Sequence, residues 1–261
     1  MKFIGIDLGW SSGESGLCRL RLESTPTGDR LGIEDMTCRL SLADIFAWLD
    51  SGVELTEGAM VAVDAPTIIP NVGGTRLPDR LTHKYFGKYH AGCYPANLAR
   101  PFAPRTTGVG KLLEERGFLH APEIQAQRQG RYQIEVFPHP AMVQLFQLER
   151  IIKYKKGNLA QKRQGLLELQ SYIENILPQL TPALDLTLPP GMEPWRSPLT
   201  LNGKELKHQE DQWDSLICAY IGAYWWYWGR ERNWVLGDES TGYIVVPTLG
   251  ADQPVPDAEK N

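Results

Sequence analysis

Residues 2–8 read KFIGIDL, a short apolar and β-branched run that ends before Gly9. This composition predicts a β-strand, and the glycine and serines that follow it predict a turn. Asp7 lies inside this strand, between two apolar residues. Because aspartate is disfavoured in strands and is rarely buried without a partner, a buried Asp7 requires a hydrogen bond, an ion pair or a bound cation.

The segments that follow the first strand predict a mixed sheet. Residues 16–22 alternate apolar and polar side chains and residues 31–40 come after a turn, so the first three strands should form an antiparallel meander. A helix over residues 41–50 leads to residues 58–64, GAMVAVD, a run typical of a strand buried on both faces. Residues 131–137 predict a later strand, reached through helical segments. This order predicts an α/β protein with an RNase H-like mixed five-stranded sheet, three antiparallel strands and then parallel ones, flanked by helices.

The length and composition are those of one globular domain. The chain has 261 residues, of which 42% are hydrophobic and 22% are charged. We expect a single RNase H-like domain over residues 1–250, with a helical and loop insertion around residues 70–130, and a flexible, polar tail over residues 251–261. The formal net charge of −4 argues against a non-specific nucleic-acid coat protein, but not against an enzyme whose carboxylates are covered by metal ions.

The sequence has the features of a soluble protein of a reducing compartment. Its first residues lead directly into a strand, and no segment reaches the roughly 20 apolar residues that span a bilayer. Its cysteines lie far apart and form no CxxC pair, which argues against a zinc knuckle and for free thiols. We therefore expect a cytoplasmic protein with no membrane partner.

Further carboxylates occur where predicted strands end and where the last long helix begins. Asp64 closes the apolar run MVAV, and Glu135 lies inside the strand QIEVF. Asp211 and Asp214 are three residues apart in a helix predicted over residues 208–228, so they share one face of it. Asp214 also begins an apolar stripe at helical spacing, which directs its side chain toward the interior. For Asp211, the alternative is a surface charge favoured by the helix dipole.

Several carboxylates in one place would require a counter-charge. Two of them about 4 Å apart repel by roughly 4 kcal/mol at an effective dielectric constant near 20. A cluster must hold protons, pair with lysine or arginine, or bind a cation, and oxygen ligands favour Mg²⁺ or Mn²⁺. We expect Asp7, Asp64 and Asp214 to be metal ligands, and Glu135 and Asp211 to complete the catalytic cluster. For each acid taken alone, a hydrogen-bonded structural role is the alternative.

Five segments of the chain together resemble a known family. They read FIGIDLGW, VAVDAP, EVFPHPA, YKKG and HQEDQWDSLICAYIGAY and lie between residues 3 and 224, and the resemblance as a whole runs from residue 3 to about residue 247. In this order they resemble the predicted RNase H-fold nucleases catalogued as domain-of-unknown-function family 429. The resemblance implies a phosphodiesterase that uses one or two divalent ions to activate water and to stabilise the leaving oxygen.

The broader superfamily also assigns places to the acids. Holliday-junction resolvases carry an acid on the first strand, an acid on the fourth strand and a DxxD pair on the last helix. Asp7, Asp64, Asp211 and Asp214 match these places, and Glu135 matches a glutamate on the fifth strand of the family. The resemblance therefore implies a nucleic acid substrate, DNA or RNA, that is cut by this carboxylate cluster.

Four basic residues are candidate accessory groups. His139 follows the strand that carries Glu135, and His208 precedes Asp211 by three residues. A neutral histidine there could position water or protonate a leaving group, although a surface or capping role is the alternative. Lys155 and Lys156, in the segment KYKKG, could contact phosphates or form a solvated helix end.

Two other functions remain open. The segment IGIDLGWSS resembles the phosphate-binding hairpin of sugar kinase-like RNase H proteins, which implies an ATP-dependent phosphotransferase. That class uses two such domains and usually a longer chain. The third alternative is a non-catalytic RNase H-like binding module that retains part of the acid cluster.

Two further regions each have a packing and a binding interpretation. Residues 220–228, YIGAYWWYW, favour core packing, with the interface of a homodimer as the alternative. The region after Asp64, including Arg76, Asp79 and Tyr94, could form a lid over a nucleic acid substrate or pack as an ordinary loop.

Overall fold

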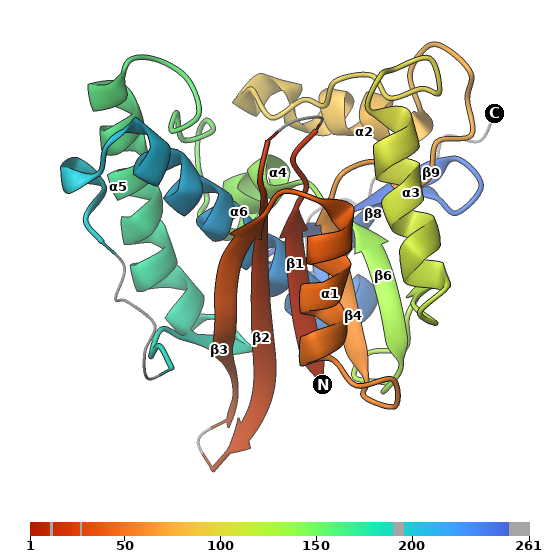
Figure 1. Ribbon diagram of the computed structural model, residues 1–261, viewed down its shortest axis with the longest axis horizontal. Helices are drawn as coiled ribbons and strands as arrows, with labels where there is room; N and C mark the ends of the chain where they lie inside the picture. The colour runs from red at the N-terminus through yellow and green to blue at the C-terminus, as the bar shows by residue number, and fades with distance from the viewer. Residues whose placement is uncertain (11–12, 27, 190–195, 251–261) are drawn as a thin grey trace.

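A mixed β-sheet lies at the centre of the computed structural model, which describes residues 1–10, 13–26, 28–189 and 196–250 (Figure 1). Its strands are β1 (Lys2–Asp7), β2 (Ser15–Thr25), β3 (Gly28–Arg39), β4 (Ala59–Asp64), β5 (Leu119–His120), β6 (Arg131–Glu135) and β7 (Ala183–Asp185). Within the described residues the strand order is β5-β6-β4-β1-β2-β3-β7. β2 pairs antiparallel with β1 and β3, and all other neighbours pair in parallel.

The predicted fold class is confirmed, with a wider sheet than expected. The strands β6-β4-β1-β2-β3 contain the predicted meander and the predicted parallel strands, an arrangement consistent with an RNase H-like fold. The described part of the sheet has seven strands instead of five, because β5 and β7 extend its two edges. These edge strands are two and three residues long, too short for an alternating pattern to predict them.

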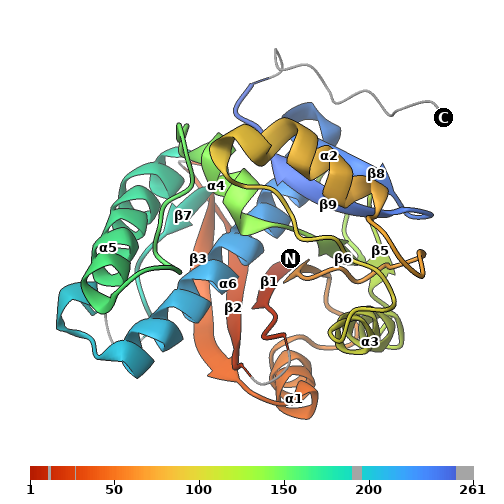
Figure 2. The ribbon, with the colours of Figure 1, turned by 90° about the horizontal axis from the view of Figure 1, so that it is seen from above.

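Helices cover both faces of this sheet (Figure 2). They are α1 (Leu42–Gly52), α2 (Leu77–Phe86), α3 (Ala103–Glu114), α4 (Pro138–Leu145), α5 (Leu159–Ile176) and α6 (Gly203–Trp228), with short 3-10 helices η1 (Gly87–Tyr89), η2 (Leu177–Gln179), η3 (Pro198–Thr200) and η4 (Gly229–Arg232). α6 crosses one face over β1, β2 and β4, while α1 and α3 pack against the other face. After α6, β8 (Asn233–Asp238) and β9 (Gly242–Pro247) form an antiparallel hairpin.

Alternation along the central strands divides the apolar core into two layers. In β1, Ile4 and Ile6 join the cluster that contains α1 and α3, whereas Phe3 joins the cluster around α6. In β4, the same alternation separates Val61 and Val63 from Met60 and Ala62. Because successive side chains of a strand point to opposite faces, the terminal residues Asp7 and Asp64 both belong to the α6 face.

Two glycines allow α6 to lie directly on the sheet. A Cβ atom on Gly5 would lie 1.9 Å from the backbone oxygen of Ser215, and one on Gly16 would lie 1.8 Å from that of Asp211. A side chain at either position would push the helix away from the close-packed sheet. The glycines therefore hold the acidic turn of α6 against β1 and β2.

The start of α6 is set by a cap that the helical pattern did not predict. The helix begins at Gly203, earlier than the expected start at His208. The side chain of Asn202 accepts hydrogen bonds from backbone N–H groups of the first turn, and Glu205 completes a capping box. This extra length places His208 within the helix, one turn before Asp211.

The aromatic half of α6 is core, as the packing interpretation predicts. Tyr224, Trp225 and Trp226 are buried, and both indole N–H groups donate hydrogen bonds to backbone carbonyls. Because these side chains are buried within the chain, they do not support the alternative that they form a homodimer interface, and a homodimer stays a prediction.

The sequence also predicts helices over residues 80–89 and 141–152, and the structure gives both of them different bounds. The helix expected over residues 141–152 is α4, which begins at Pro138 and ends at Leu145; Gln147 then adopts a φ of 52°, outside the helical region. The helix expected over residues 80–89 begins earlier, at Leu77. The strand β8 was not expected.

Residues 251–261, predicted to form a tail, lie outside the described residues. No helix in the described part of the chain combines the length and apolarity needed to cross a membrane.

Candidate metal centre

β1 and β4 end side by side, and each ends in an aspartate. The two strands pair in parallel with Asp7 opposite Asp64. Both side chains belong to the α6 face, because alternation places them there with Phe3 and Met60. Two carboxylates of neighbouring strands therefore project from the same edge of the sheet, toward its α6 face.

α6 adds a third carboxylate to this place, Asp214. Its side chain has no solvent-exposed surface (0%), which confirms that it faces the interior. The Tyr154 hydroxyl donates a hydrogen bond to Oδ1 of Asp214 at 2.6 Å, and the Lys155 ammonium group makes an ion pair with Oδ2 at 2.7 Å. Oδ2 accepts no directed hydrogen bond from any described residue.

Lys155 is the cation on which the three acids converge. Burial is the largest influence on Asp7 and Asp64 and raises both pKa values, and Asp214 raises them further, while Lys155 opposes the rise. The result is a pKa well above the ordinary value for Asp7 and a pKa of about 7 for Asp64. Burial disfavours the charge of Lys155, but Asp214 and the other acids raise its pKa overall. The buried Asp214 and the partly buried Asp7 and Asp64 thus interact with one ammonium group, which leaves a deficit of positive charge among the described residues.

This deficit predicts that the metal-free protein loses stability as pH rises. The pKa of Asp64 is raised from 3.8 to about 7, so its contribution is fully present below the lower value and is lost as pH rises through the higher one. Asp64→Asn removes the titrating group. Its free energy of unfolding relative to the wild type should therefore increase by on the order of 2 kcal/mol between roughly pH 5 and pH 8.

Urea denaturation in the presence of a chelator measures this difference. The comparison with the wild type at each pH removes the opposite contribution of His139, whose pKa is lowered and which favours folding at higher pH. A difference that does not change with pH would show that Asp64 is not held at a raised pKa.

The cluster has the donor atoms that a hard divalent cation prefers, but its carboxylate oxygens are too far apart to share one ion. Its three aspartates offer carboxylate oxygens, the ligand chemistry of Mg²⁺ and Mn²⁺. Within the described residues, however, the one group of three candidate ligands with an atom each inside 4.8 Å of one another is Glu14, Cys38 and His208. The three aspartates are more widely spaced around Lys155. A shared ion would require the ammonium group to leave and the carboxylates to turn inward.

Glu135 lies beside the cluster, where its charge, after burial and Asp214, also contributes to the raised pKa of Asp64. It alternates with Ile134 and Val136, which join the α6-side core, so its own side chain points to the opposite face. There it forms a buried ion pair with Arg76, at 2.7 Å between Oε1 and Nη2, and Arg76 pairs in turn with Asp79 at 2.7 Å. Burial raises the pKa of Glu135 to about 7 against the opposing charge of Arg76. The packing interpretation of Arg76 and Asp79 is confirmed.

Asp211 lies at the margin of the cluster. It is 3% exposed, and its carboxylate contributes to the raised pKa of Asp7. Its Oδ1 is paired with Lys207 Nζ at 2.5 Å, and the same ammonium group contacts Glu210 at 2.8 Å. Asp211 is therefore neutralised mainly by Lys207 of the same helix.

The four basic candidates occupy different places. His139 lies beside the cluster, with its ring centroid 5.8 Å from that of Tyr154, and its buried Nδ1 has no hydrogen-bond partner in the described part of the chain. Burial and the charge of Lys155 lower its pKa to about 4, so the imidazole is neutral at pH 7. Lys156 is exposed next to Lys155. His208 faces Glu14 instead of the aspartates.

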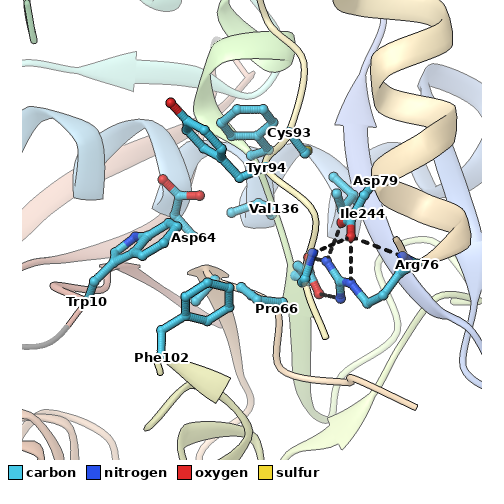
Figure 3. Close-up of a pocket in the computed structure, with 14 residues that line it drawn as sticks. Trp10, Asp64, Pro66, Arg76, Asp79, Cys93, Tyr94, Phe102, Val136 and Ile244 are labelled. Atoms are coloured by element: carbon cyan, nitrogen blue, oxygen red, sulfur yellow. Dashed lines mark hydrogen bonds and ion pairs between the residues drawn. The ribbon is translucent and has the colours of Figure 1, made fainter. Parts of the chain in front are cut away.

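A pocket of about 530 Å³, including its open mouth, adjoins Asp64 (Figure 3). Trp10 and Phe102 meet edge to face with ring centroids 4.5 Å apart, and the Asp64 carboxylate lies between Trp10 and Tyr94 in this view. Trp10 is 52% exposed and Tyr94 is 75% exposed. The buried ion pairs of Arg76 with Asp79 and Glu135 form another part of the lining. The pocket therefore offers aromatic surface to a ligand that also reaches Asp64.

Two of the site residues were not predicted from the sequence. Tyr154 lies in the basic segment KYKKG, where a tyrosine between lysines is an amphipathic signal that can indicate a buried ring. For Arg76 the sequence indicates only a region that could form a lid or pack as an ordinary loop. The burial of Arg76 depends on Glu135 and Asp79, which lie on different elements, and no local pattern reveals that.

The comparisons with known proteins identify a family but no characterised relative. The family model described as "Protein of unknown function (DUF429)" matches residues 5–239. No curated protein and no solved structure matches the chain. The matched range contains most of the central strands, all of α6 and the five carboxylates that the sequence predicts as site residues. The chain therefore belongs to the DUF429 family.

Proposed function

We propose that this protein is a divalent-metal-dependent phosphodiesterase that cuts nucleic acid, with Asp7, Asp64 and Asp214 as the ligands of Mg²⁺ or Mn²⁺. The observation that carries the proposal is the convergence of three carboxylates, the partly buried Asp7 and Asp64 of β1 and β4 and the buried Asp214 of α6, on one ammonium group of the described residues. A cluster with this deficit of positive charge, at the edge of a sheet and next to a pocket, favours binding of a divalent cation.

Each group near the cluster has a role in this proposal. The three aspartates hold the metal, which when bound would activate water and stabilise charge on the leaving oxygen. The Tyr154 hydroxyl fixes the orientation of Asp214 through its hydrogen bond. The neutral imidazole of His139 can accept or position a proton beside the cluster, because its Nδ1 is free of described partners.

The pocket supports a nucleic acid as the substrate. Exposed aromatic rings bind unstacked bases with little dependence on sequence, and Trp10 and Tyr94 offer such rings beside Asp64. Lys153 and Lys156 are exposed on the segment that carries Lys155, so they can contact backbone phosphates.

Lys155 acts as a removable counter-ion in this account. Its ammonium group occupies the place where a metal would neutralise Asp214, and the two cations would repel each other. Lys155→Met should therefore tighten Mn²⁺ binding about tenfold or more, which corresponds to at least about 1.4 kcal/mol. Isothermal titration calorimetry measures the affinity, and Lys156→Met, at the exposed neighbouring position, is the matched control. Unchanged or weaker binding by Lys155→Met would contradict this role.

Activity assays distinguish the proposal from its alternatives. The purified protein is incubated with Mn²⁺ or Mg²⁺ and with branched and linear DNA and RNA, and cleavage that depends on the metal supports the proposal. Turnover of ATP with a small-molecule acceptor would favour a phosphotransferase instead. Metal binding without cleavage of any substrate would favour a binding module.

A further inference from the structure

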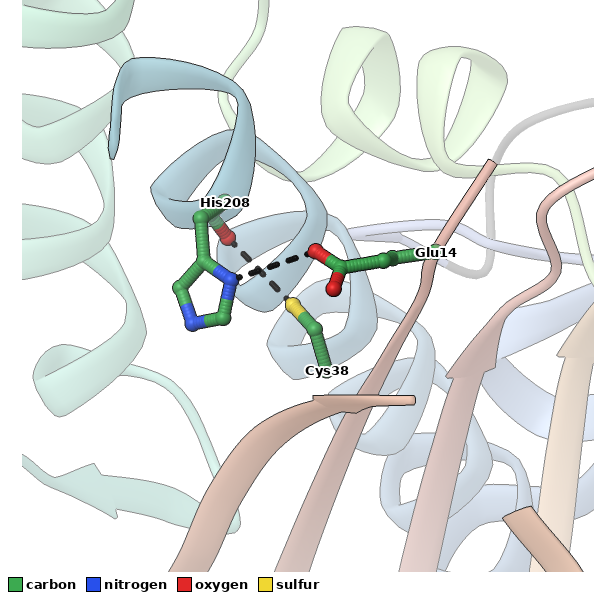
Figure 4. A group of neighbouring side chains, drawn as sticks. All are labelled: Glu14, Cys38 and His208. Carbon is green, nitrogen blue, oxygen red and sulfur yellow. Dashed lines mark hydrogen bonds and ion pairs between the residues drawn. The ribbon is translucent and has the colours of Figure 1, made fainter. Parts of the chain in front are cut away.

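A second group of metal-ligating side chains lies at the start of α6, on the other side of Asp211 from the aspartate cluster. Glu14 precedes β2, Cys38 is the next-to-last residue of β3, and His208 is on α6, so three distant segments meet there (Figure 4). One ligand atom from each side chain lies within 4.8 Å of the other two. His208 Nδ1 is 3.5 Å from Glu14 Oε2, and Cys38 Sγ donates a hydrogen bond to the backbone oxygen of His208 at 3.6 Å.

We propose that Glu14, Cys38 and His208 form a binding site for a soft divalent cation of the Zn²⁺ class, separate from the aspartate site. Thiolate, imidazole and carboxylate are the protein ligands of Zn²⁺, and a thiolate selects against Mg²⁺. Zinc–ligand bonds of about 2.0–2.3 Å place the ligand atoms of a tetrahedron roughly 3.3–3.8 Å apart. The observed 3.5 Å between His208 and Glu14 falls within this range, so small side-chain rotations would complete the site.

The surroundings of the three side chains are also suited to a cation. Cys38 is buried, whereas the Glu14 and His208 side chains are 46% and 47% exposed. An ion can therefore enter from solvent, and a water molecule can complete the coordination. Burial raises the pKa of the Cys38 thiol, and the nearby carboxylates of Asp211, Glu14 and Asp7 raise it further against the charge of Lys207. Burial works against the thiolate form, whereas the three carboxylates favour a cation that would displace the thiol proton. On binding, the thiol loses its proton to solvent and gives up its hydrogen bond to the His208 carbonyl.

A bound cation would connect three elements of the structure. It would attach α6 to the end of β3 and to the loop before β2, in the same region where Gly16 lets the helix touch the sheet. The site would thus hold the acidic turn of α6 in place without taking part in phosphodiester cleavage.

Cobalt substitution tests this inference on the full chain. Co²⁺ is titrated into the chelator-treated protein, and the near-ultraviolet charge-transfer band of a cobalt-bound thiolate is recorded together with the visible bands of tetrahedral cobalt. We expect the thiolate band to saturate at one equivalent. It should be absent in Cys38→Ser, retained in Cys93→Ser, and shifted to at least about tenfold higher Co²⁺ concentration in His208→Gln and Glu14→Gln.

Three outcomes would overturn the inference: no thiolate band with excess Co²⁺, a band that persists in Cys38→Ser, or unchanged affinity in His208→Gln. The last variant changes an exposed side chain, so it gives an answer even if Cys38→Ser fails to fold. Asp7→Asn should leave the thiolate band unchanged, which separates failure of this site from failure of the proposed phosphodiesterase.

Discussion

Asp7→Asn should lower metal-dependent phosphodiester cleavage by about 10³-fold, because it removes one of three carboxylates that hold the cation. Stabilisation of charge by a metal is worth several kcal/mol, and each 1.4 kcal/mol corresponds to about a factor of ten in rate. The same substitution should keep or increase the stability of the metal-free protein, since it removes a partly buried carboxylate with a raised pKa. Loss of activity with preserved stability is the signature of a functional site that is strained in the absence of its ligand.

The assay compares initial cleavage rates at saturating Mn²⁺ with the midpoint of urea denaturation in a chelator. Asp50→Asn is a matched control, because Asp50 is a partly exposed aspartate that pairs with Arg116 on the surface. It should change both quantities little. Cleavage that survives Asp7→Asn at the wild-type rate would remove Asp7 from the catalytic assignment.

Arg76→Met should reduce the free energy of unfolding by about 3–5 kcal/mol, the cost of leaving a buried ion-pair partner unpaired. Arg76 is 3% exposed, and its guanidinium group holds both Glu135 and Asp79. Its Nη1 also donates a hydrogen bond to the Ile68 carbonyl. A buried arginine with three partners on separate segments joins α2, β6 and the loop after β4.

Urea denaturation measures this loss, with Arg116→Ala as the comparison. Arg116 makes a similar pair with Asp50 on the surface, so its removal should cost no more than about 1 kcal/mol. A second substitution, Glu135→Gln, should recover part of the loss in Arg76→Met, because it removes the charge that was left unpaired. Equal effects at Arg76 and Arg116 would show that the buried ion pairs do not stabilise this region.

The acids that meet in the structure were predictable because each stands at a position with a simple geometric meaning. Asp7 and Asp64 end two apolar runs, and parallel pairing brings such ends together. Asp214 starts an apolar stripe, and helical periodicity alone turns it inward. The end of an apolar run and the period of a helix are both local properties of the sequence. Together they were sufficient to predict the core of the cluster.

The remaining features depend on register or on contacts between distant segments. Glu135 also lies near the end of a strand, but β6 pairs with β4 so that Glu135 stands opposite Val63 instead of Asp64. A shift of one residue changes the face, and the sequence does not specify it. Lys155 comes from an irregular segment between α4 and α5, whose path is set by tertiary packing. The convergence of Glu14, Cys38 and His208 is a similar long-range contact.

A crystal soaked with Mn²⁺ and measured at the manganese absorption edge shows whether the three aspartates bind a divalent cation. We predict an anomalous difference peak bounded by the carboxylates of Asp7, Asp64 and Asp214, at the Mn–oxygen distances of a hard divalent ion, with the Lys155 ammonium group moved away from Asp214. The absence of a peak there, with Lys155 still paired to Asp214 at saturating Mn²⁺, would contradict the account and leave the cluster as a lysine-neutralised structural feature.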